Sequence, residues 1–371
     1  MRLASFNLEN IFDRAKALNL ATWADGKPIL AEVQKLNGIL NQEEYSAADK
    51  QAIKASLKAL GLNKGDDAGQ FVILRQNRGR LVKRRKGKPI EVVANGRGDW
   101  IGWIELKTEE VNEIATRTTA QVVRDIKPDV MGVIEVDNRI ALKRFNEQLI
   151  PLVGGKPYAH VMLIDGNDER GIDVGLLTRN GFDILSMCSH VDDRHKGQRL
   201  FSRDCPEYEV KLPSGRRLLL LINHFKSKGF GSAAGSNAKR TAQAKKVRDI
   251  YDERLAENPL IAVLGDLNDT PDTGPLDHLL KRGSTLKDIF THPKFQDPAG
   301  RPGTFGNATK SQKLDYILLS PKLFAAVTTA GVWRKGVWGG KNGTLWPHYP
   351  EMAQPIHAAS DHAALWVDLA I

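Results

Sequence analysis

The chain has 371 residues, a hydrophobic content of 41% and a formal net charge of +10. This length and composition allow one large domain or two smaller ones with a sizeable core, and they exclude a disordered chain. The positive charge favours a polyanionic partner, nucleic acid before an anionic membrane surface, although solubility alone would also explain it.

The first predicted element is a strand at LASFNL, and a region of different character follows it. Residues 13–108 predict a helix over 43–60, two strands around a basic turn over 71–93, and a further strand over 100–106. We interpret 13–108 as an α/β subdomain of unknown role that is inserted into a larger domain.

The basic turn of this insertion has two readings. It contains Lys83, Arg84, Arg85, Lys86 and Lys88. Such a tract could bind the phosphates of a nucleic acid backbone. It could equally be the solvated tip of a hairpin, and the sequence leaves both readings open.

The remaining elements alternate between strands and helices. A helix is predicted over 109–126, because apolar residues recur there at helical intervals and Lys127 and Pro128 end the pattern. A second amphipathic helix, with a basic polar face, is predicted over 237–255. Buried strands are predicted at DVMGVIEV, IDVGLLT, RLLLLIN, LIAVLGDL, DYILLS and AALWVDLAI. This order predicts a layered α/β protein with a packed sheet core.

Cysteine content and the N-terminal sequence predict a cytoplasmic protein. The two cysteines, Cys188 and Cys205, form no CxxC pair and favour a reducing compartment, although they could form a single bridge. No apolar run is long enough to span a membrane. The segment MRLASFNLEN is strand-like from its start and lacks the apolar stretch and cleavage site of a signal peptide.

Polar residues stand at one end of five of the apolar runs. Ligands and catalytic groups gather where strands end, because the strands fix their positions and the loops admit substrate. Each group alone could be an ordinary turn, a solvated strand end or a buried histidine. A single shared site explains all of them at once, and it would contain Asn7, Glu9, Glu135, Asn223, His224, Asp266, Asn268, Ser360, Asp361 and His362.

These residues occur in motifs that resemble a known family. The order FN(x)EN, VIEVDN, RGIDVGLL, NHFKSK, GDLND, KLDYILLS and SDHAAL is similar to that of the endonuclease/exonuclease/phosphatase superfamily, which has the deoxyribonuclease-I-like fold. The similarity covers residues 1–12 and about 110–371. It implies a four-layered α/β sandwich, with two packed mixed sheets flanked by helices, in a single domain over 1–371 that carries the insertion.

The resemblance also implies a metal site and a water-activating pair. Asn7 and Glu135 would hold Mg2+ or Mn2+, ions that prefer oxygen ligands and retain water. Asp361 would be a further ligand of the metal or of its water. Asp266 would orient or deprotonate the attacking water, and Asn268 would steady that water and the phosphate.

Two histidines would complete the catalytic set. The resemblance implies that His362 contacts the phosphate or transfers protons, with Asp315 holding it in the useful tautomer. His224 would stabilise the transition state, with Asp173 as a plausible partner. Arg203 could bind a flanking phosphate, or it could be an ordinary surface arginine.

The chemistry of these residue types agrees with phosphodiester hydrolysis. A divalent ion supplies a charge sink and polarises water. Histidines and asparagines add fixed electrostatic stabilisation, and a carboxylate near histidines supplies acid–base catalysis. The sequence has no GxSxG motif, no P-loop motif and no HExxH motif, which disfavours a covalent esterase, an NTPase and a zinc site.

Three functions follow as hypotheses. The first is a metal-dependent nuclease that acts on DNA, with Lys226, Lys228, Arg84 and Arg85 on the phosphate backbone. The second is a phosphoesterase for an inositol phosphate or a phospholipid headgroup, which the same fold would serve. The tryptophan-rich segment 331–359 keeps a lipid substrate open, although its tryptophans could also stack on bases or pack the loop onto the domain. The third is a non-catalytic nucleic-acid-binding module.

Overall fold

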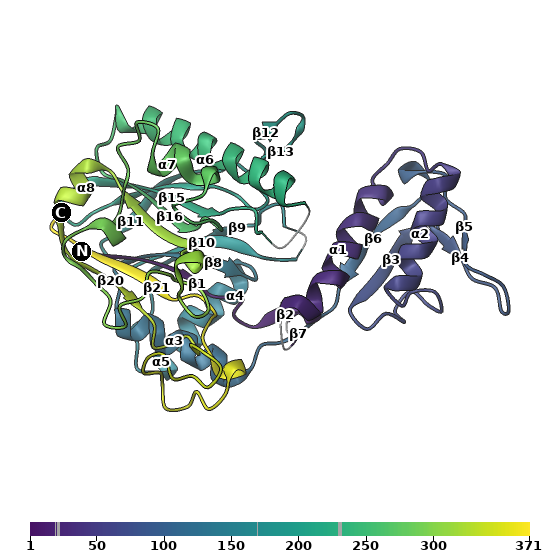
Figure 1. The fold of residues 1–371 in the computed structure, drawn as a ribbon, viewed down its shortest axis with the longest axis horizontal. Coiled ribbons are helices and arrows are strands. Elements are labelled where there is room, and N and C mark those ends of the chain that lie inside the picture. Colours follow the sequence, from purple (N-terminus) through teal and green to yellow (C-terminus); the bar gives the residue numbers. More distant parts are fainter. Residues whose placement is uncertain (19, 21–22, 169, 229–231) are drawn as a thin grey trace. The chain divides into compact units, whose positions relative to one another are not determined.

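The computed structural model describes residues 1–18, 20, 23–168, 170–228 and 232–371 (Figure 1). These residues form two compact units. We call Met1–Phe12, Val111–Lys228 and Ser232–Ile371 the main unit, and we call Asp13–Glu110 the inserted unit. Each unit has its own sheets and its own hydrophobic core.

The main unit contains two mixed β-sheets. The first has the strand order β18 (Phe295–Gln296), β20 (Val327–Trp333), β21 (Ala364–Leu369), β1 (Arg2–Asn7), β8 (Val130–Val136), β10 (Asp173–Thr178) and β9 (His160–Ile164). The second has the order β11 (Asp183–Cys188), β14 (Glu207–Lys211), β15 (Arg217–His224), β16 (Ile261–Asp266), β19 (Asp315–Leu319) and β17 (Lys287–Asp288). β1 runs parallel to β8, and β15 runs parallel to β16. The carboxyl ends of each of these pairs therefore meet at one edge of their sheet.

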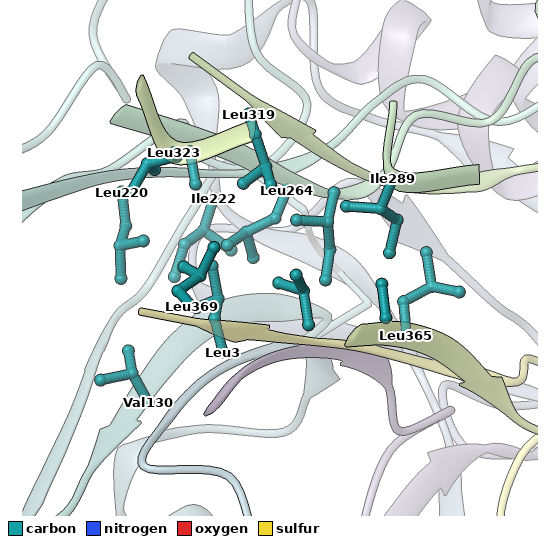
Figure 2. Close-up of a cluster of buried hydrophobic side chains, with 14 of the residues drawn as sticks. Leu3, Val130, Leu220, Ile222, Leu264, Ile289, Leu319, Leu323, Leu365 and Leu369 are labelled. Atoms are coloured by element: carbon teal, nitrogen blue, oxygen red, sulfur yellow. The ribbon is translucent and has the colours of Figure 1, made fainter. Parts of the chain in front are cut away.

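The two sheets enclose the main hydrophobic core (Figure 2). Leu220 and Leu264 extend from the second sheet toward Leu3 and Leu365 of the first, and all four are buried. Burial of each such side chain stabilises the fold by about 1.5–3 kcal/mol. The close approach of the sheets requires glycine at position 132, because a Cβ at Gly132 would lie 2.2 Å from Cδ1 of Leu264.

Helices cover the outer face of each sheet. α3 (Glu113–Ile126) packs against the first sheet through a cluster that includes Val122 of the helix and Phe6 of β1. α6 (Ala233–Leu255) packs against the second sheet through a cluster that includes Val247 and residues of β15 and β16. The order of helix, sheet, sheet and helix confirms the four-layered α/β sandwich that the sequence predicts.

Capping residues decide where the two long helices begin. The sequence predicts a helix over 109–126, but α3 begins at Glu113, because the side chain of Asn112 accepts hydrogen bonds from two N–H groups of the first turn. α6 begins at Ala233, earlier than predicted, after the N-cap Ser232. The shorter helical elements of the main unit are α4 (Arg139–Arg144), the π-helix Phe145–Leu149, α5 (Ile150–Leu152), α7 (Asp277–Leu280) and α8 (Pro321–Ala325).

The three tryptophans that end β20 and follow it pack into the main unit. Trp346 is buried in the core between the sheets. The indole Nε1 of Trp333 donates to the hydroxyl of Tyr349 at 3.3 Å, and Trp338 stacks on His348 with ring centroids 5.2 Å apart. Trp346 is buried and Trp333 and Trp338 are partly buried, so these side chains mainly pack the loop onto the unit.

The inserted unit packs two helices against a small sheet. α1 (Trp23–Leu40) and α2 (Ala47–Ala59) share a core with the antiparallel strands β3 (Val72–Arg78) and β6 (Ile101–Leu106). The predicted helix over 43–60 begins later than expected, at α2, because its N-terminus is fixed by a capping box. The remaining strands pair β4 with β5 and β2 with β7, and their bounds are Val82–Lys83, Glu91–Val92, Asp13–Ala15 and Thr108–Glu110.

Both cysteines are unpaired. Cys188 is exposed at the end of β11, and Cys205 is buried before β14. Within the described ranges, no helix is long and apolar enough to cross a membrane.

Candidate active site

Three polar side chains form a row across the second sheet. The side chains of β15 and β16 alternate between the core and the outer helix layer, which places His224 after Ile222 and Asp266 after Leu264 on the core side. Asp266 is in register with His224 on one neighbouring strand and with Asp315 on the other. All three are buried, so they stand side by side where the apolar core ends.

Glu135 reaches the same place through a β-bulge. In the pairing of β8 with β10, Ile134 opposes Val174 and Val136 opposes Asp173, which leaves Glu135 without an opposite residue. Its φ is +56°, a left-handed conformation that is uncommon for a residue with a side chain. Ile134 packs in the inner cluster and Val136 in the outer one, so the bulge shifts the alternation and re-aims the carboxylate.

One oxygen atom of Asp266 lies at the centre of the site. Asp266 Oδ2 is 3.4 Å from Nδ2 of Asn7, 3.7 Å from Nε2 of His224 and 3.8 Å from Nε2 of His362. Oε1 of Glu135 lies 3.2 Å from the same Asn7 nitrogen and 3.5 Å from Nε2 of His224. The structure thus brings together five predicted residues from separate segments of the main unit.

Asp315 holds His362 in place. Its Oδ2 lies 2.8 Å from Nδ1 of His362, and its own backbone N–H donates to Oγ1 of Thr304 at 3.0 Å. Because Asp315 occupies Nδ1, Nε2 of the ring is left to face Asp266 and, at 3.6 Å, Oδ1 of Asp361. This is the orientation that sequence analysis expects for an acid–histidine pair.

Burial and nearby charges shift the pKa values of the central residues in different directions. Burial raises the pKa of Asp266 to about 7. Burial alone would lower the pKa of His362, but the neighbouring carboxylates, Asp315 foremost, hold it well above its usual value. Burial, joined by the positive charge of Arg203, lowers the pKa of His224 well below its usual value. Near neutral pH the site therefore contains one cationic and one neutral histidine.

A buried ion cluster adjoins these residues. Asp168 accepts two hydrogen bonds from Arg170, at 2.8 and 2.7 Å, and lies 3.0 Å from Nε of Arg203. Arg203 is only 2% exposed, so it is not the surface arginine that was one reading of the sequence. Sequence reasoning missed Asp168 and Arg170, although Arg170 begins the RGIDVGLL motif and could have been found there.

Asp173 and Asn268 are two further predicted catalytic residues. Asp173 accepts a hydrogen bond from the N–H of Gly166 at 2.7 Å, and burial raises its pKa to about 7. It is not hydrogen-bonded to His224 as expected, since Nδ1 of His224 has no hydrogen-bond partner in the part of the chain that the structure describes. Asn268 lies beside Asp266, because its backbone N–H donates to Oδ1 of that residue at 2.8 Å, and its φ of +52° is again left-handed.

Lys226 and Lys228 follow β15 directly. Burial and the charge of Arg203 lower the pKa of Lys226 to about 8. Nζ of Lys228 lies 2.7 Å from Asp269, which also pairs with the buried Arg240 at 2.9 Å. Lys228, Arg240 and Asp269 line a pocket together with Ala233, Ser236, Asn237 and Thr273.

Arg84 and Arg85 lie in the inserted unit and differ from each other. The guanidinium of Arg84 pairs with Asp66 at 2.5 Å and donates to the carbonyl of Leu62 at 2.7 Å. It thus packs within its own unit. Arg85 is exposed, and its closest acidic neighbour, Glu91, is 3.8 Å away. Of the two, only Arg85 has a side chain that is open to a substrate.

At this site, two groups of described side chains could hold a metal ion, because their donor atoms lie within 4.8 Å of one another. One group is Glu135, His224 and Asp266, and the other is Asp266, Asp315 and His362. The first fits a divalent cation better, because neutral His224 adds no positive charge beside the carboxylates, whereas the ring of His362 is cationic and already bonded to Asp315. Carboxylate oxygens are the donors that Mg2+ and Mn2+ prefer.

Two further predicted ligands, Asn7 and Asp361, border this group. Asn7 directs Nδ2 toward the acids and uses Oδ1 to accept from the N–H of Glu9 at 3.0 Å, so a ligand role requires its amide to turn. The backbone N–H of Asp361 donates to Oε2 of Glu9 at 3.1 Å, and its side chain is 45% exposed. Both residues are close enough to contribute oxygen atoms or to hold water.

A third acid–histidine group lies elsewhere, on β11 and β14. Cys188, His190 and Glu207 have donor atoms within the same distance of one another. Both ring nitrogens of His190 are already bonded, to Asp193 at 2.9 Å and Glu207 at 3.0 Å, and Glu207 also pairs with Arg254 at 2.8 Å. These contacts make it a structural ion network.

The fold and the central site together define a class of enzyme. Two packed sheets flanked by helices, with buried acids and histidines that could bind a metal ion at one edge, are the features of a phosphoesterase. A profile of the Endonuclease/Exonuclease/phosphatase family matches residues 91–327. The protein belongs to this family.

Solved structures with a similar fold include two proteins of Bacteroides thetaiotaomicron. One is a mannosyl-6-phosphatase with 20% sequence identity and a TM-score of 0.51, matched over 70% of this chain and 92% of that chain. The other is an endonuclease/exonuclease/phosphatase family protein with 20% identity and a TM-score of 0.50, matched over 68% and 86%. At this identity the likeness concerns the fold alone. No curated protein matched the sequence.

Proposed function

We propose that the main unit hydrolyses phosphodiester bonds of nucleic acid, DNA first, with the help of a divalent cation. The observation that carries the proposal is the position of Asp266 Oδ2, which lies within 3.8 Å of Asn7, His224 and His362 at once. One carboxylate oxygen surrounded by such groups is suited to orient a water molecule against a bound phosphate.

The pKa of Asp266 matches the role of a general base. A base works best when its pKa lies near the working pH, and burial raises that of Asp266 to about 7. Glu135, with Asn7 and Asp361 around it, would hold the cation. When bound, a divalent ion would draw charge from the nonbridging phosphate oxygens and polarise the attacking water.

The two histidines would stabilise charge that develops on the phosphate. His362 is cationic because of Asp315, and its Nε2 faces the centre of the site, where it can donate to a phosphate oxygen or to the leaving group. His224 is neutral and can donate from Nε2 without adding a charge. Asn268 would help to position the water through its contact with Asp266.

Charge supports a nucleic acid as the substrate. The net charge is +10, and Lys226, Lys228 and Arg170 lie near the site. The tryptophans Trp333 and Trp346 are packed into the main unit, so they supply little of the exposed apolar surface that a phospholipid substrate would favour. The unpaired cysteines fit the reducing, cytoplasmic compartment that we expect for such an enzyme.

A small phosphate ester is the second candidate. This class of substrate includes the inositol phosphate that the sequence suggests. A protein of similar fold is a mannosyl-6-phosphatase. The same acid–histidine set could serve a monoester, because fold and catalytic groups do not select the substrate. Only a comparison of substrates separates the two candidates.

The test compares substrates with and without metal. We would incubate the full chain with plasmid DNA, a labelled oligonucleotide, mannose 6-phosphate and an inositol phosphate, each with Mg2+ or with EDTA. We expect DNA cleavage in Mg2+ and none in EDTA. Phosphate release from the small esters without DNA cleavage would overturn the nuclease proposal in favour of the second candidate.

A matched pair of variants excludes a contaminating nuclease. Asp266→Asn should abolish cleavage, because it removes the central carboxylate while keeping its size. Asp249→Asn changes an exposed aspartate on α6, which pairs with Lys245, and should cleave like the unmodified protein. Equal cleavage by both variants would show that the activity does not arise at this site.

A further inference from the structure

The small sheet of the inserted unit has one face that its own helices leave uncovered. Val72 of β3 and Ile104 of β6 point into the core beneath α1 and α2. Ile101 and Trp103 alternate with Ile104 along β6 and point the other way, and they are 49% and 44% exposed. Two large apolar side chains thus stand next to each other on an open face.

An arginine lies opposite each of these apolar side chains. In the antiparallel pair, Arg75 is the partner of Trp103 and Arg78 is the partner of Ile101, and cross-strand partners share a face. This arrangement depends on a bulge, because the register shifts between Gln76 and Arg78. Without the shift, the pleat would turn Arg78 to the opposite face from Arg75.

Glu105 fixes the arrangement. It accepts two hydrogen bonds from Arg75, to Oε2 and Oε1 at 2.8 Å each. These hydrogen bonds from Arg75 are the largest influence on the Glu105 carboxylate and lower its pKa. The indole and the guanidinium are therefore held side by side on the surface, and binding through them loses little side-chain freedom.

We propose that this face binds single-stranded nucleic acid, with bases on Trp103 and Ile101 and backbone phosphates against Arg75 and Arg78. Aromatic side chains stack on any base, and arginines beside them contact the phosphates. Ile101 and Trp103 are separated by about 6.8 Å along the strand, which is about twice the ~3.4 Å base spacing of a stacked strand. Bases on Trp103 and Ile101 would therefore not be stacked directly on each other, which an unpaired strand allows.

Other occupants fit the face less well. A duplex keeps its base faces stacked inside and could not use the exposed indole. A lipid surface would remove water from the Glu105 carboxylate, which is 37% exposed and lies two residues after Trp103 on the same strand. The basic character continues along the chain after β3, where the exposed residues Arg80, Lys83, Arg85, Lys86 and Lys88 follow. The charge therefore favours a polyanion.

The inference rests on the proposed function and extends it by naming single-stranded nucleic acid as the form that binds. Its test measures binding by the full chain in EDTA, so that catalysis plays no part. We would follow the fluorescence anisotropy of a labelled 15-mer single strand. Trp103→Ala should weaken binding about tenfold or more, whereas Trp103→Phe, which keeps an aromatic face, should bind within about threefold of the unmodified protein.

Two further measurements complete the test. Arg78→Ala should reduce the slope of log affinity against log salt by about 0.7, the value for one phosphate contact on a single strand. Leu152→Ala, which changes a 66% exposed leucine of the main unit, is the control and should not alter binding. Circular dichroism would show that each variant is folded. Arg78→Ala keeps the inference testable if Trp103→Ala does not fold, because an unchanged salt slope would overturn it.

Three other outcomes would also overturn the inference. The first is unchanged affinity in both Trp103 variants. The second is an equal loss of affinity for a duplex and for a single strand in Trp103→Ala. The third is a Trp103→Ala variant that loses binding to anionic phospholipid vesicles but keeps its affinity for the single strand. The proposed function is tested separately, because cleavage of a small aryl phosphodiester in Mg2+ measures the activity of the main unit. Trp103→Ala should leave that cleavage unchanged.

Discussion

Oδ2 of Asp315 lies 2.8 Å from Nδ1 of His362, and this contact joins β19 of the second sheet to the segment that leads into β21 of the first. The contact fixes the tilt of the imidazole and determines which ring nitrogen faces Asp266. It thus links the packing of the two sheets to the geometry of the site, and the catalytic consequences can be measured.

Asp315→Asn should lower turnover by about 10²- to 10⁴-fold with a smaller effect on KM. The amide keeps the size of the side chain but loses the charge that makes His362 cationic. Steady-state kinetics on a cleavable substrate would measure the effect. Asp249→Asn, an exposed position on α6, is the control. Turnover within twofold of the unmodified enzyme would assign the proton-handling role to another group.

Much of the central site could be predicted because it follows strand periodicity. His224 and Asp266 continue the inward positions of apolar strands, so their placement follows from the alternation seen in RLLLLINH and IAVLGD. Glu135 does not follow it, because a bulge interrupts its strand, and a bulge depends on the partner strand β10. The contact that the structure gives Asp173 is likewise not local, since it accepts a hydrogen bond from the Gly166 backbone.

Contacts between loops that are far apart in the chain could not be predicted from the sequence. Asp168 and Arg203 pair across a span that no local pattern encodes, and nothing in the composition distinguishes a buried arginine from an exposed one. The sequence predicts an inserted region over 13–108 because the pattern of elements changes there. The compact unit in the structure is Asp13–Glu110. Its open sheet face depends on the β3–β6 register, which the sequence of either strand alone does not reveal.

Glu135→Gln should weaken the apparent affinity for Mg2+ by at least about tenfold. The change removes a negative charge from the group that would hold the cation, and it preserves the shape of the bulged side chain. Metal titrations of activity, together with calorimetric titration with Mn2+, would measure it. Glu147→Gln, which changes an exposed glutamate paired with Lys143, serves as the control. An unchanged metal requirement would place the cation elsewhere.

Asp168→Asn should destabilise the main unit by about 3–5 kcal/mol, because it removes the carboxylate that the buried Arg203 and the partly buried Arg170 share. Urea unfolding would give the free energy difference. Asp165→Asn, an exposed position in the same loop, should change stability by less than about 0.5 kcal/mol. Equal stability of the two variants would mean that water or another group satisfies the arginines.

The pair His190–Glu207 should make stability depend on pH. Hydrogen bonds from His190 and Arg254 outweigh burial and lower the pKa of Glu207 to about 2 from an ordinary 4.5, so its contribution is present above pH 4.5 and is lost as the pH falls toward 2. The hydrogen bond to Glu207 raises the pKa of His190 above 6.5. Its contribution is complete below pH 6.5 and is lost as the pH rises through the higher value.

Glu207→Gln should therefore cost most stability between about pH 4.5 and 6.5, where both contributions are present, on the order of 1–3 kcal/mol. The difference from the unmodified protein should shrink at pH 8 and again at pH 3. Thermal unfolding across this range would measure it, and Glu209→Gln on the same strand is the control, because its partner Arg217 is 64% exposed. A stability difference that stays constant with pH would show that the network holds Glu207 by packing and not by charge.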